Sequence, residues 1–438
     1  MLSRWYVALV LVLALVACAP SPNLTPVPTQ TESAFTLASS RAEQPVTPAV
    51  TPTPAIETGT LTVRVWWPDE LYPSEGSEAE DLLLQQFEGF RTSYTAYDLV
   101  VRRKRADGLG GILPTLRTAR TVAPGAMPDL TLMRYSDMVT AVTEGLIVPL
   151  NAIVPADLVD DNLLGPARAL GEFGGQLYGV PYVLNFYHTA YRASLLDGPL
   201  LTFDEVLDAQ PVYAFPAGSG VGSLVNWTVL TQYLAAGGRL VDETGAAVLD
   251  SDPLLTVLAY YEAGVAEGLF PATLLEATDV ASYWPDFANA ATNMLNLDAF
   301  TYLQNKDLVQ NVGLAALPTA AGQPLTLLDG WVWVMTTQDP DHQNQALAFV
   351  SWMMRVNPQS LLTEAMGVLP SQRRALRLWD NETYVDFAQE LIASGRVIPS
   401  AQRGGPAAAA LQAGFAAVLQ GSPAEQAAES ALAQLPFE

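Results

Sequence analysis

The residues able to perform covalent or metal chemistry are few and far apart. The 438-residue chain contains two histidines, His188 and His342, and one cysteine, Cys18. Neither histidine lies in an HExxH pattern or at a spacing typical of metal ligands, so the sequence predicts no metal site, no catalytic residue and no cofactor. A single cysteine also excludes a disulfide within these residues. These residues therefore give little support to catalysis, and we expect that the protein is not an enzyme.

A glycine-rich stretch at 218–222 needs separate consideration because Ser219 lies within it. No lysine follows, as a phosphate loop would require, and the glycines are not spaced as in the elbow that presents a nucleophilic serine. We interpret the stretch as a flexible loop at the edge of a binding cleft.

Composition and charge limit the class of protein further. The chain carries 45 acidic and 21 basic side chains, a net charge of −24. Nucleic acids and anionic lipid surfaces both attract basic proteins, so neither is an expected partner. Half of the residues are hydrophobic, and a chain of this length is expected to form more than one core.

The N-terminus has the pattern of an export signal. Arg4 precedes an apolar run over residues 5–17, which ends in Leu-Val-Ala before Cys18. This pattern resembles the lipobox of bacterial lipoproteins, in which the cysteine is lipidated after cleavage. We predict a signal peptide over 1–17, lipidation of Cys18 and a disordered tether rich in proline and threonine over 18–59. The folded part would then be held at the outer face of the cell membrane by lipid alone.

Strand and helix patterns alternate from residue 61 onward. Ser77 and Glu80 form a capping-box pattern at the start of the first helix. Such an alternation predicts a parallel sheet whose binding loops lie at the ends of the strands. Strands are expected at 61–67, 98–102 and 128–133, with helices after Ser77, over 109–122 and after Ser136.

A second alternation follows the segment 174–185, which we interpret as a crossover between two α/β lobes. Pro181 favours extended backbone there. Later in the chain, Asp339 and Pro340 are typical of a capped helix start. Further strands are expected at 186–191, 212–215, 292–297 and 311–316, and helices through Trp227 and over 252–268.

Taken together, the order of these segments resembles the extracellular solute-binding proteins of ABC importers, in the maltose-binding-like group known as family 1. The resemblance covers roughly residues 60–438 and implies an α/β fold, a two-lobed clamp with three inter-lobe crossovers. The implied crossovers are near 180–185, 329–331 and 376–381, which gives lobes of 60–181 with 330–376 and of 182–329 with 377–438. The segments that carry the resemblance are the first strand with Asp69, Pro128-Asp129, Gly175–Pro181, Leu317-Pro318 with Gly322, Leu328–Trp333, the helix 346–354 and Gly367–Pro370.

The resemblance also implies a function and a set of cleft residues. The protein would capture a sugar or oligosaccharide and deliver it to the permease subunits of an importer, acting as a monomer. Aromatic rings suit the apolar faces of sugars, and polar groups suit their hydroxyls. Family members that bind sugars often have a carboxylate where this chain has Asn185. The implied ligand-binding residues are Trp66, Asp69, Arg134, Tyr135, Asn185, Tyr187, Ser219, Trp227, Asp298, Phe300 and Trp331, together with Trp67 and Asn296 at the same strand ends.

Two alternatives to a sugar-binding protein remain open at this point. The solute could be a polyamine or a polyol phosphate, and the acidic charge favours the former over the latter. A surface enzyme that degrades glycans is the other alternative, and paired carboxylates across a cleft would be its mark.

Overall fold

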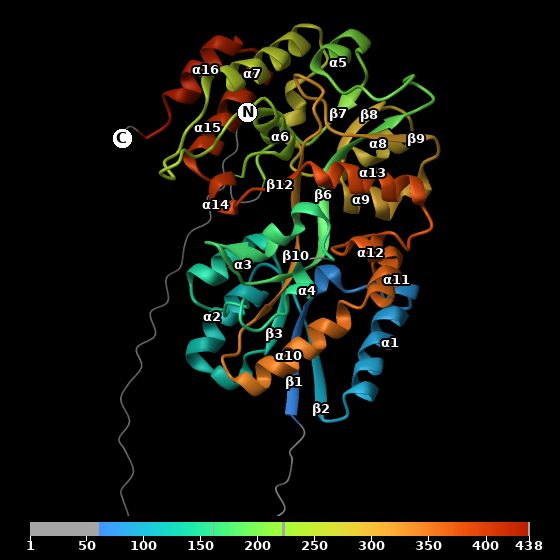
Figure 1. Cartoon of the computed structure of the whole chain (residues 1–438). Coiled ribbons are helices and arrows are strands. Elements are labelled where there is room, and N and C mark those ends of the chain that lie inside the picture. The colour runs from blue at the N-terminus through green and yellow to red at the C-terminus, as the bar shows by residue number, and fades with distance from the viewer. Residues whose placement is uncertain (1–60, 161, 221–223, 437–438) are drawn as a thin grey trace, which may run out of the picture. The chain divides into compact units, whose positions relative to one another are not determined.

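The computed structural model describes residues 61–160, 162–220 and 224–436. The predicted signal peptide, the tether and the lipidation site at Cys18 lie outside these residues. Within them, one mixed sheet of ten strands has the main order β2-β1-β3-β10-β6-β8-β7, with β11 and β9 pairing with β6 and β12 pairing with β10. Figure 1 shows the sheet passing through two lobes, each covered by helices.

The first lobe is built on parallel strands, as the alternation predicts. Strand β1 (Leu61–Pro68) pairs in parallel with β2 (Tyr97–Lys104) and β3 (Leu130–Arg134). Strand β10 then runs antiparallel to β3. The helices of this lobe are α1 (Glu78–Ser93), α2 (Ile112–Val122), α3 (Tyr135–Thr143), α4 (Ala156–Val159), α10 (Pro340–Met353), α11 (Val356–Met366) and α12 (Arg373–Leu376).

Two long strands, β6 (Val180–Arg192) and β10 (Thr326–Met335), join the lobes. The first half of β6 pairs with β10 and with β11 (Leu369–Pro370), and its second half pairs with β8 (Met294–Asp298) and β9 (Val312–Ala315). The predicted crossover and the strand expected at 186–191 are therefore one continuous strand. The third crossing between the lobes follows α12 and returns the chain to the second lobe.

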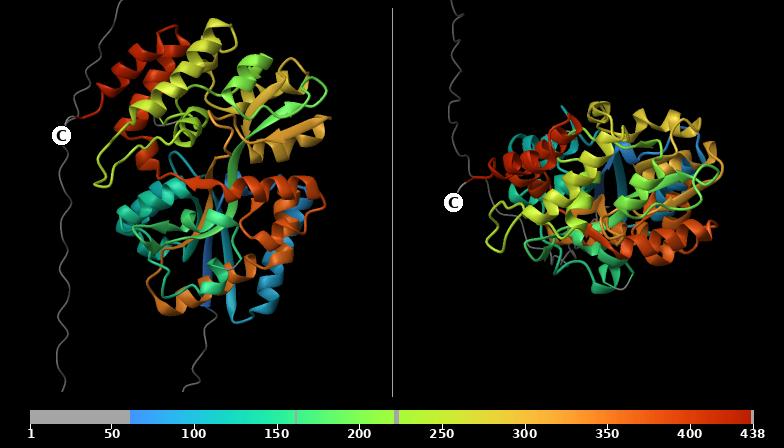
Figure 2. Two further views of the ribbon diagram at one scale, coloured as in Figure 1. Left: turned by 45° about the horizontal axis from the view of Figure 1, so that its top comes forward. Right: turned by 90° about the horizontal axis from the view of Figure 1, so that it is seen from above.

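The second lobe contains shorter strands and most of the later helices. Figure 2 shows α7 beside α15 and α16. These three helices pack on one another and cover one side of the lobe. Its remaining strands are β7 (Tyr213–Ala214) and β12 (Gly395–Val397). Its helices are α5 (Phe203–Ala209), α6 (Trp227–Ala235), α7 (Ser251–Ala266), α8 (Trp284–Ala288), α9 (Ala299–Asn305), α13 (Glu382–Ala393), α14 (Ser400–Arg403), α15 (Pro406–Leu419) and α16 (Ala424–Leu432).

Local sequence signals place several of these elements. The Ser77 side chain accepts a hydrogen bond from the Glu80 amide at the start of α1, as predicted. The Glu80 carboxylate, however, accepts from Gly76 rather than from Ser77. Asp339 caps α10 by accepting from the amides of Asp341 and His342. Helix α3 begins at Tyr135 with Arg134 at its cap position, so Ser136 lies inside the helix and does not cap it.

Helix α7 begins two residues earlier than its signal of Asp252 as cap and Pro253 in the first turn indicates. Its cap position is Asp250, and Asp252 lies in the first turn. The two-residue turn between β4 (Glu172–Phe173) and β5 (Gln176–Leu177) is formed by Gly174 and Gly175. Both glycines have positive φ, at 58° and 77°, which is the backbone that a tight hairpin turn demands.

Aromatic packing fixes the centre of the first lobe. The rings of Trp67 and Trp333 meet edge to face with centroids 5.5 Å apart, and Phe349 of α10 packs against Trp333 at 5.7 Å. Trp67 and Trp333 are 0% and 1% exposed. The two tryptophans are therefore core residues, in agreement with the alternation of side chains along β1 and β10.

Candidate functional site

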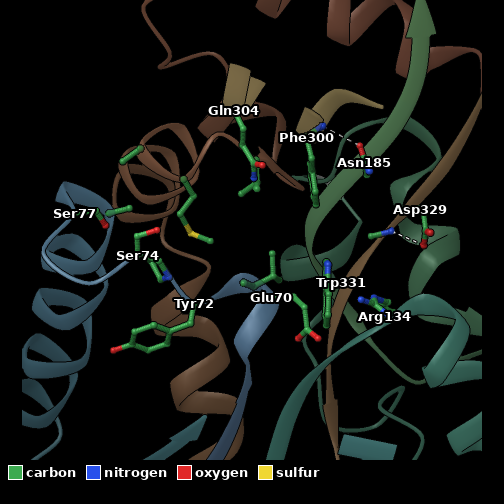
Figure 3. Close-up of a pocket in the computed structure, with 17 residues that line it drawn as sticks. Glu70, Tyr72, Ser74, Ser77, Arg134, Asn185, Phe300, Gln304, Asp329 and Trp331 are labelled. Carbon is green, nitrogen blue, oxygen red and sulfur yellow. Dashed lines mark hydrogen bonds between the residues drawn. The ribbon is translucent and has the colours of Figure 1, made fainter. Parts of the chain in front are cut away.

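A cavity of about 570 Å³ lies near the strand ends, and we call it the first cavity (Figure 3). The carboxyl ends of parallel strands meet at one edge of a sheet, which brings the turn after β1 and the end of β3 together. Residues of β6, β10 and α9 and the C-terminal end of α11 complete its wall. Its lining consists of Glu70–Ser74, Ser77, Ala79, Arg134, Asn185, Phe300, Gln304, Asp329–Trp331, Ala365, Met366 and Val368.

Trp331 and Arg134 form one wall of the first cavity. They lie opposite each other in the β10–β3 pairing, and the Arg134 guanidinium carbon is 5.1 Å from the centroid of the Trp331 ring. Arg134 also forms an ion pair with Asp107. Trp331 is only 6% exposed, so most of its ring is held by the protein and a small part faces the cavity. The wall therefore presents a fixed aromatic ring beside a cation.

Asn185 lines the first cavity and is bonded to Asp298, which lines a second one. Its side-chain amide donates to Asp298 Oδ1 at 3.1 Å, and its oxygen accepts from the amide of Phe300 at 3.3 Å. Asp298 is in turn the cap of α9 and accepts from the amide and the hydroxyl of Thr301. Asn185 thus links β6 to the start of α9 through bonds that fix both side chains.

The second cavity has a volume of about 280 Å³ and is built by the second lobe. Tyr187 of β6 stacks on Trp227 with ring centroids 4.4 Å apart. The Arg403 guanidinium carbon lies 3.5 Å from the centroid of the Trp227 ring. Asn226 caps α6 by accepting from the Val229 amide, which fixes the position of Trp227. Other lining residues are Pro216, Gly218, Gly220, Val225, Thr228, Thr278–Ala281, Asn296–Asp298, Thr301 and Leu317.

Burial alters the ionisation of several groups around the cavities. It raises the pKa of Asp329, although the nearby Arg403 and Arg134 act in the opposite direction. Burial also raises the pKa of Asp137 to about 6 and that of Tyr135 to about 12. These shifts indicate poor solvation beside the first cavity, where a hydrogen bond to a polar solute contributes more than it would in open water.

The sequence profile of one protein family matches residues 97–389, more than half of the chain. The family is described as the bacterial extracellular solute-binding proteins. This chain belongs to that family. The match confirms the recognition made from the order of the sequence segments. Among curated protein sequences, none matches the chain.

Solved structures with the same two-lobed fold include several solute-binding proteins. A cyclic α-maltosyl-1,6-maltose binding protein from Arthrobacter globiformis superposes with a TM-score of 0.68 at 18% identity, covering 86% of this chain and 98% of its own. The maltose-bound MalE3 of T. maritima gives 0.65 at 16%, covering 85% and 98%. A solute-binding protein from Thermotoga lettingae with bound α-D-tagatose gives 0.60 at 16%, covering 85% and 98%. At these identities the likeness establishes the fold.

Seven of the eleven predicted ligand-binding residues line the two cavities of this solute-binding protein. Four of them lie in the first cavity and three in the second. Asn296 lines the second cavity as well, but its side chain is buried and bonded to Thr189, Tyr213 and Thr228. The seven are Arg134, Asn185, Phe300 and Trp331 in the first cavity, and Tyr187, Trp227 and Asp298 in the second.

The structure does not bring Trp66, Asp69, Tyr135 and Ser219 into either cavity. Trp66 is buried at 4% exposure with the Lys104 ammonium over its ring. Asp69 enters the 3-10 turn after β1 and pairs with Arg103 at 2.9 Å. Tyr135 is buried within the first lobe.

Ser219 is exposed and lines a separate hollow beside α15.

Several cavity residues were not identified from the sequence. Glu70 and Tyr72 follow Asp69 directly, and the turn over Asp69–Leu71 carries them to the first cavity instead. Asp329 was recognised only as part of a crossover. Arg403 lies far along the chain in α14, and no local pattern connects it with Trp227.

Two further observations concern the described part of the chain. Within residues 61–436, apart from the gaps at 161 and 221–223, no three His, Cys, Asp or Glu side chains are grouped as ligands for a metal ion. In the same residues, no helix has the length and apolar character needed to cross a membrane.

Proposed function

We propose that this solute-binding protein captures a sugar or oligosaccharide between its lobes and delivers it to the permease of an ABC importer. The observation that carries the proposal is the pairing of aromatic and polar groups in two adjoining cavities. Trp331 and Phe300 in the first, and Trp227 in the second, can cover the apolar faces of sugar rings. Amide, carboxylate and guanidinium groups from both lobes are available for hydroxyls.

The solved structures of similar fold support this reading. The proteins from Arthrobacter globiformis and T. maritima are described with cyclic α-maltosyl-1,6-maltose and with maltose, and the Thermotoga lettingae protein with α-D-tagatose. These solutes range from a single sugar to cyclic oligosaccharides. A first cavity of about 570 Å³ is within the range of pockets that hold small ligands.

A thermal-shift screen tests the proposal, because a solute that binds only the folded state raises the melting temperature. The panel should contain neutral sugars, sugar acids, polyamines and polyol phosphates, with titration calorimetry to confirm each hit. Binding of a mono- or oligosaccharide in the micromolar range or tighter is expected. Binding of a polyamine alone, or release of cleaved oligosaccharide by the purified protein, would contradict the proposal.

The lobes are proposed to comprise 60–181 with 330–376 and 182–329 with 377–438, and to close around the solute by bending at the crossovers. Closure of this kind is a population shift that requires the solute to bind the closed form more tightly.

We expect sugar to shorten the distance between spin labels placed on the two lobes. A Cys18→Ala background would carry new cysteines at Leu109 in the first lobe and at Glu276 in the second, both of which are exposed. Pulsed electron resonance should give a shorter mean distance at saturating sugar. An unchanged distribution, with binding verified by calorimetry, would show that the lobes do not close.

Lipidation of Cys18 is proposed to hold the protein at the outer face of the membrane as a monomer. We expect Cys18→Ala to abolish incorporation of a labelled fatty acid and to remove the protein from the detergent-soluble membrane fraction. Ser21→Ala, a change of similar size close to the same site, should retain both. Normal labelling of the Cys18→Ala chain would contradict this assignment.

A further inference from the structure

Arg403 is an unusual residue in the wall of the second cavity. Its side chain makes no hydrogen bond or ion pair with any residue that the structure describes, and its Nε atom is buried. Burial lowers the pKa of Arg403 from its ordinary value, but a guanidinium remains charged at physiological pH. Burying a guanidinium costs free energy unless another group accepts hydrogen bonds from its N–H donors.

The carboxylates near Arg403 are already engaged elsewhere. Asp298 accepts three hydrogen bonds, from the side chain of Asn185 and from the amide and hydroxyl of Thr301. Asp329 accepts from the amide of Gly330 at 2.8 Å. Asp329 favours the charged guanidinium from a distance, but neither carboxylate pairs with it. The polar edge of the guanidinium is therefore available to a molecule in the cavity.

Other arginines in comparable places are satisfied by the protein. Arg192, 8% exposed, donates to the carbonyls of Phe287, Ala288 and Gln310. Arg134, the cation in the wall of the first cavity, pairs with Asp107. The fold thus supplies partners for the guanidinium groups it buries elsewhere, and Arg403 is the exception at a ligand-sized cavity.

The position of Arg403 is fixed by stacking. The guanidinium lies over the Trp227 ring, which itself stacks on Tyr187. Stacking occupies the face of the guanidinium and leaves the donors at its edge, in the fork geometry that a carboxylate accepts with two parallel bonds. A phosphate carries nearly two negative charges, and Arg403 is the only basic residue that lines this cavity among those described. Asp298 and Asp279, which accepts from the amide of Ala281, line the cavity as well, so one cation beside two carboxylates suits a monoanion better than a phosphate.

We propose that the solute is an acidic carbohydrate, with the carboxylate of a uronic acid unit held by Arg403 in the second cavity. This inference rests on the proposed function, because it specifies which sugars the cleft accepts. The neutral part of an oligosaccharide would occupy the first cavity, where Trp331 and Phe300 supply apolar surface. Asn185 and Asp298 lie between the two positions.

Calorimetry with matched probes tests the inference on the full chain. Each of two sets contains three sugars that differ only in the group at carbon 6. The first set is glucose, glucuronate and glucose 6-phosphate, and the second is galactose, galacturonate and galactose 6-phosphate. Digalacturonate and galactobiose form a matched disaccharide pair. We expect the uronate of at least one set to bind about tenfold or more tightly than its neutral partner, as a hydrogen-bonded charge pair would give.

Variants of Arg403 test whether this residue causes the preference for uronates. Arg403→Gln should remove the preference, so that the uronate and its neutral partner bind this variant with similar affinity. Arg403→Lys should keep only part of the preference because lysine lacks the fork. Arg396→Gln removes the same charge from an exposed site on β12 and should change nothing. Melting curves check that each variant is folded.

The possible outcomes distinguish a failure of this inference from a failure of the proposed function on which it rests. Equal affinity for neutral and uronate sugars in the unaltered chain would overturn the inference and leave a sugar-binding protein. Preference for the 6-phosphates would overturn the assignment of a carboxylate. A uronate preference that survives Arg403→Gln would exclude Arg403 as its source. Failure of every sugar in the panel to bind would contradict the proposed function itself.

Discussion

Replacing Trp331 with alanine should weaken sugar binding by about 2 to 4 kcal/mol, roughly thirtyfold to a thousandfold. The ring is held in the first cavity by Arg134 and by the strand pairing of β10 with β3. Its loss would remove the aromatic surface and release the Arg134 side chain from its position. The measurement is calorimetry with the tightest sugar found in the thermal-shift screen.

Because Trp331 is largely buried, its truncation also leaves a void that lowers stability. Trp331→Phe keeps most of the packing and should retain more affinity than alanine does. Trp352→Phe provides the matched control, since Trp352 packs on Phe90 and Arg355 and lines neither cavity. Near-normal affinity in a folded Trp331→Ala protein would mean that the ring serves packing alone.

The variant Gly330→Ala should lower the free energy of unfolding by roughly 1 to 3 kcal/mol. Gly330 lies inside β10 opposite Leu184 of β6 and has no positive φ, so its role is to allow the close approach of the two strands. An added Cβ would lie 2.3 Å from the Val183 carbonyl oxygen. A backbone atom in a paired strand cannot move aside as a flexible side chain can. The loss of free energy of unfolding should therefore lie near the upper end of this range.

Denaturant unfolding measures this effect. Gly125→Ala is a suitable control because an added Cβ there meets no atom within 4 Å, and its stability should be unchanged or slightly raised. If Gly330→Ala were as stable as Gly125→Ala, β6 and β10 could separate at this point without cost.

Short-range signals in the sequence predicted much of the fold. Ser77 and Asp339 cap the helices that follow them because a cap depends on residues two or three positions away. The strands β1, β2 and β3 appear where the apolar patterns place them. Even here the first side chain after a strand was uncertain, since a single turn of 3-10 helix after β1 leaves Asp69 outside the cavity and brings Glu70 into it.

Local sequence patterns could not predict the features of the fold that depend on residues far apart in the chain. Nothing near Pro181 or Arg192 indicates that one strand of 13 residues joins them, because its continuity depends on partners from β10, β8 and β9. Arg403 reaches Trp227 only through the packing of the second lobe. Sequence patterns therefore led to the strand ends, where Arg134 lines the first cavity but Asp69 does not, and they gave no indication of Arg403.

The long strands β6 and β10 have a consequence for how this protein could acquire a new solute. Leu184, Val332 and Trp333 on these strands are fully or almost fully buried, so a change that alters the bending of the strands also alters the stability of the core. Glu70 and Ser74, in the turn after β1, are exposed and line the first cavity. Substitutions in such connections are tolerated far better than those in paired strands. Evolution of binding preference in this protein would accordingly proceed through the turn after β1, while the strands that join the lobes stay unchanged.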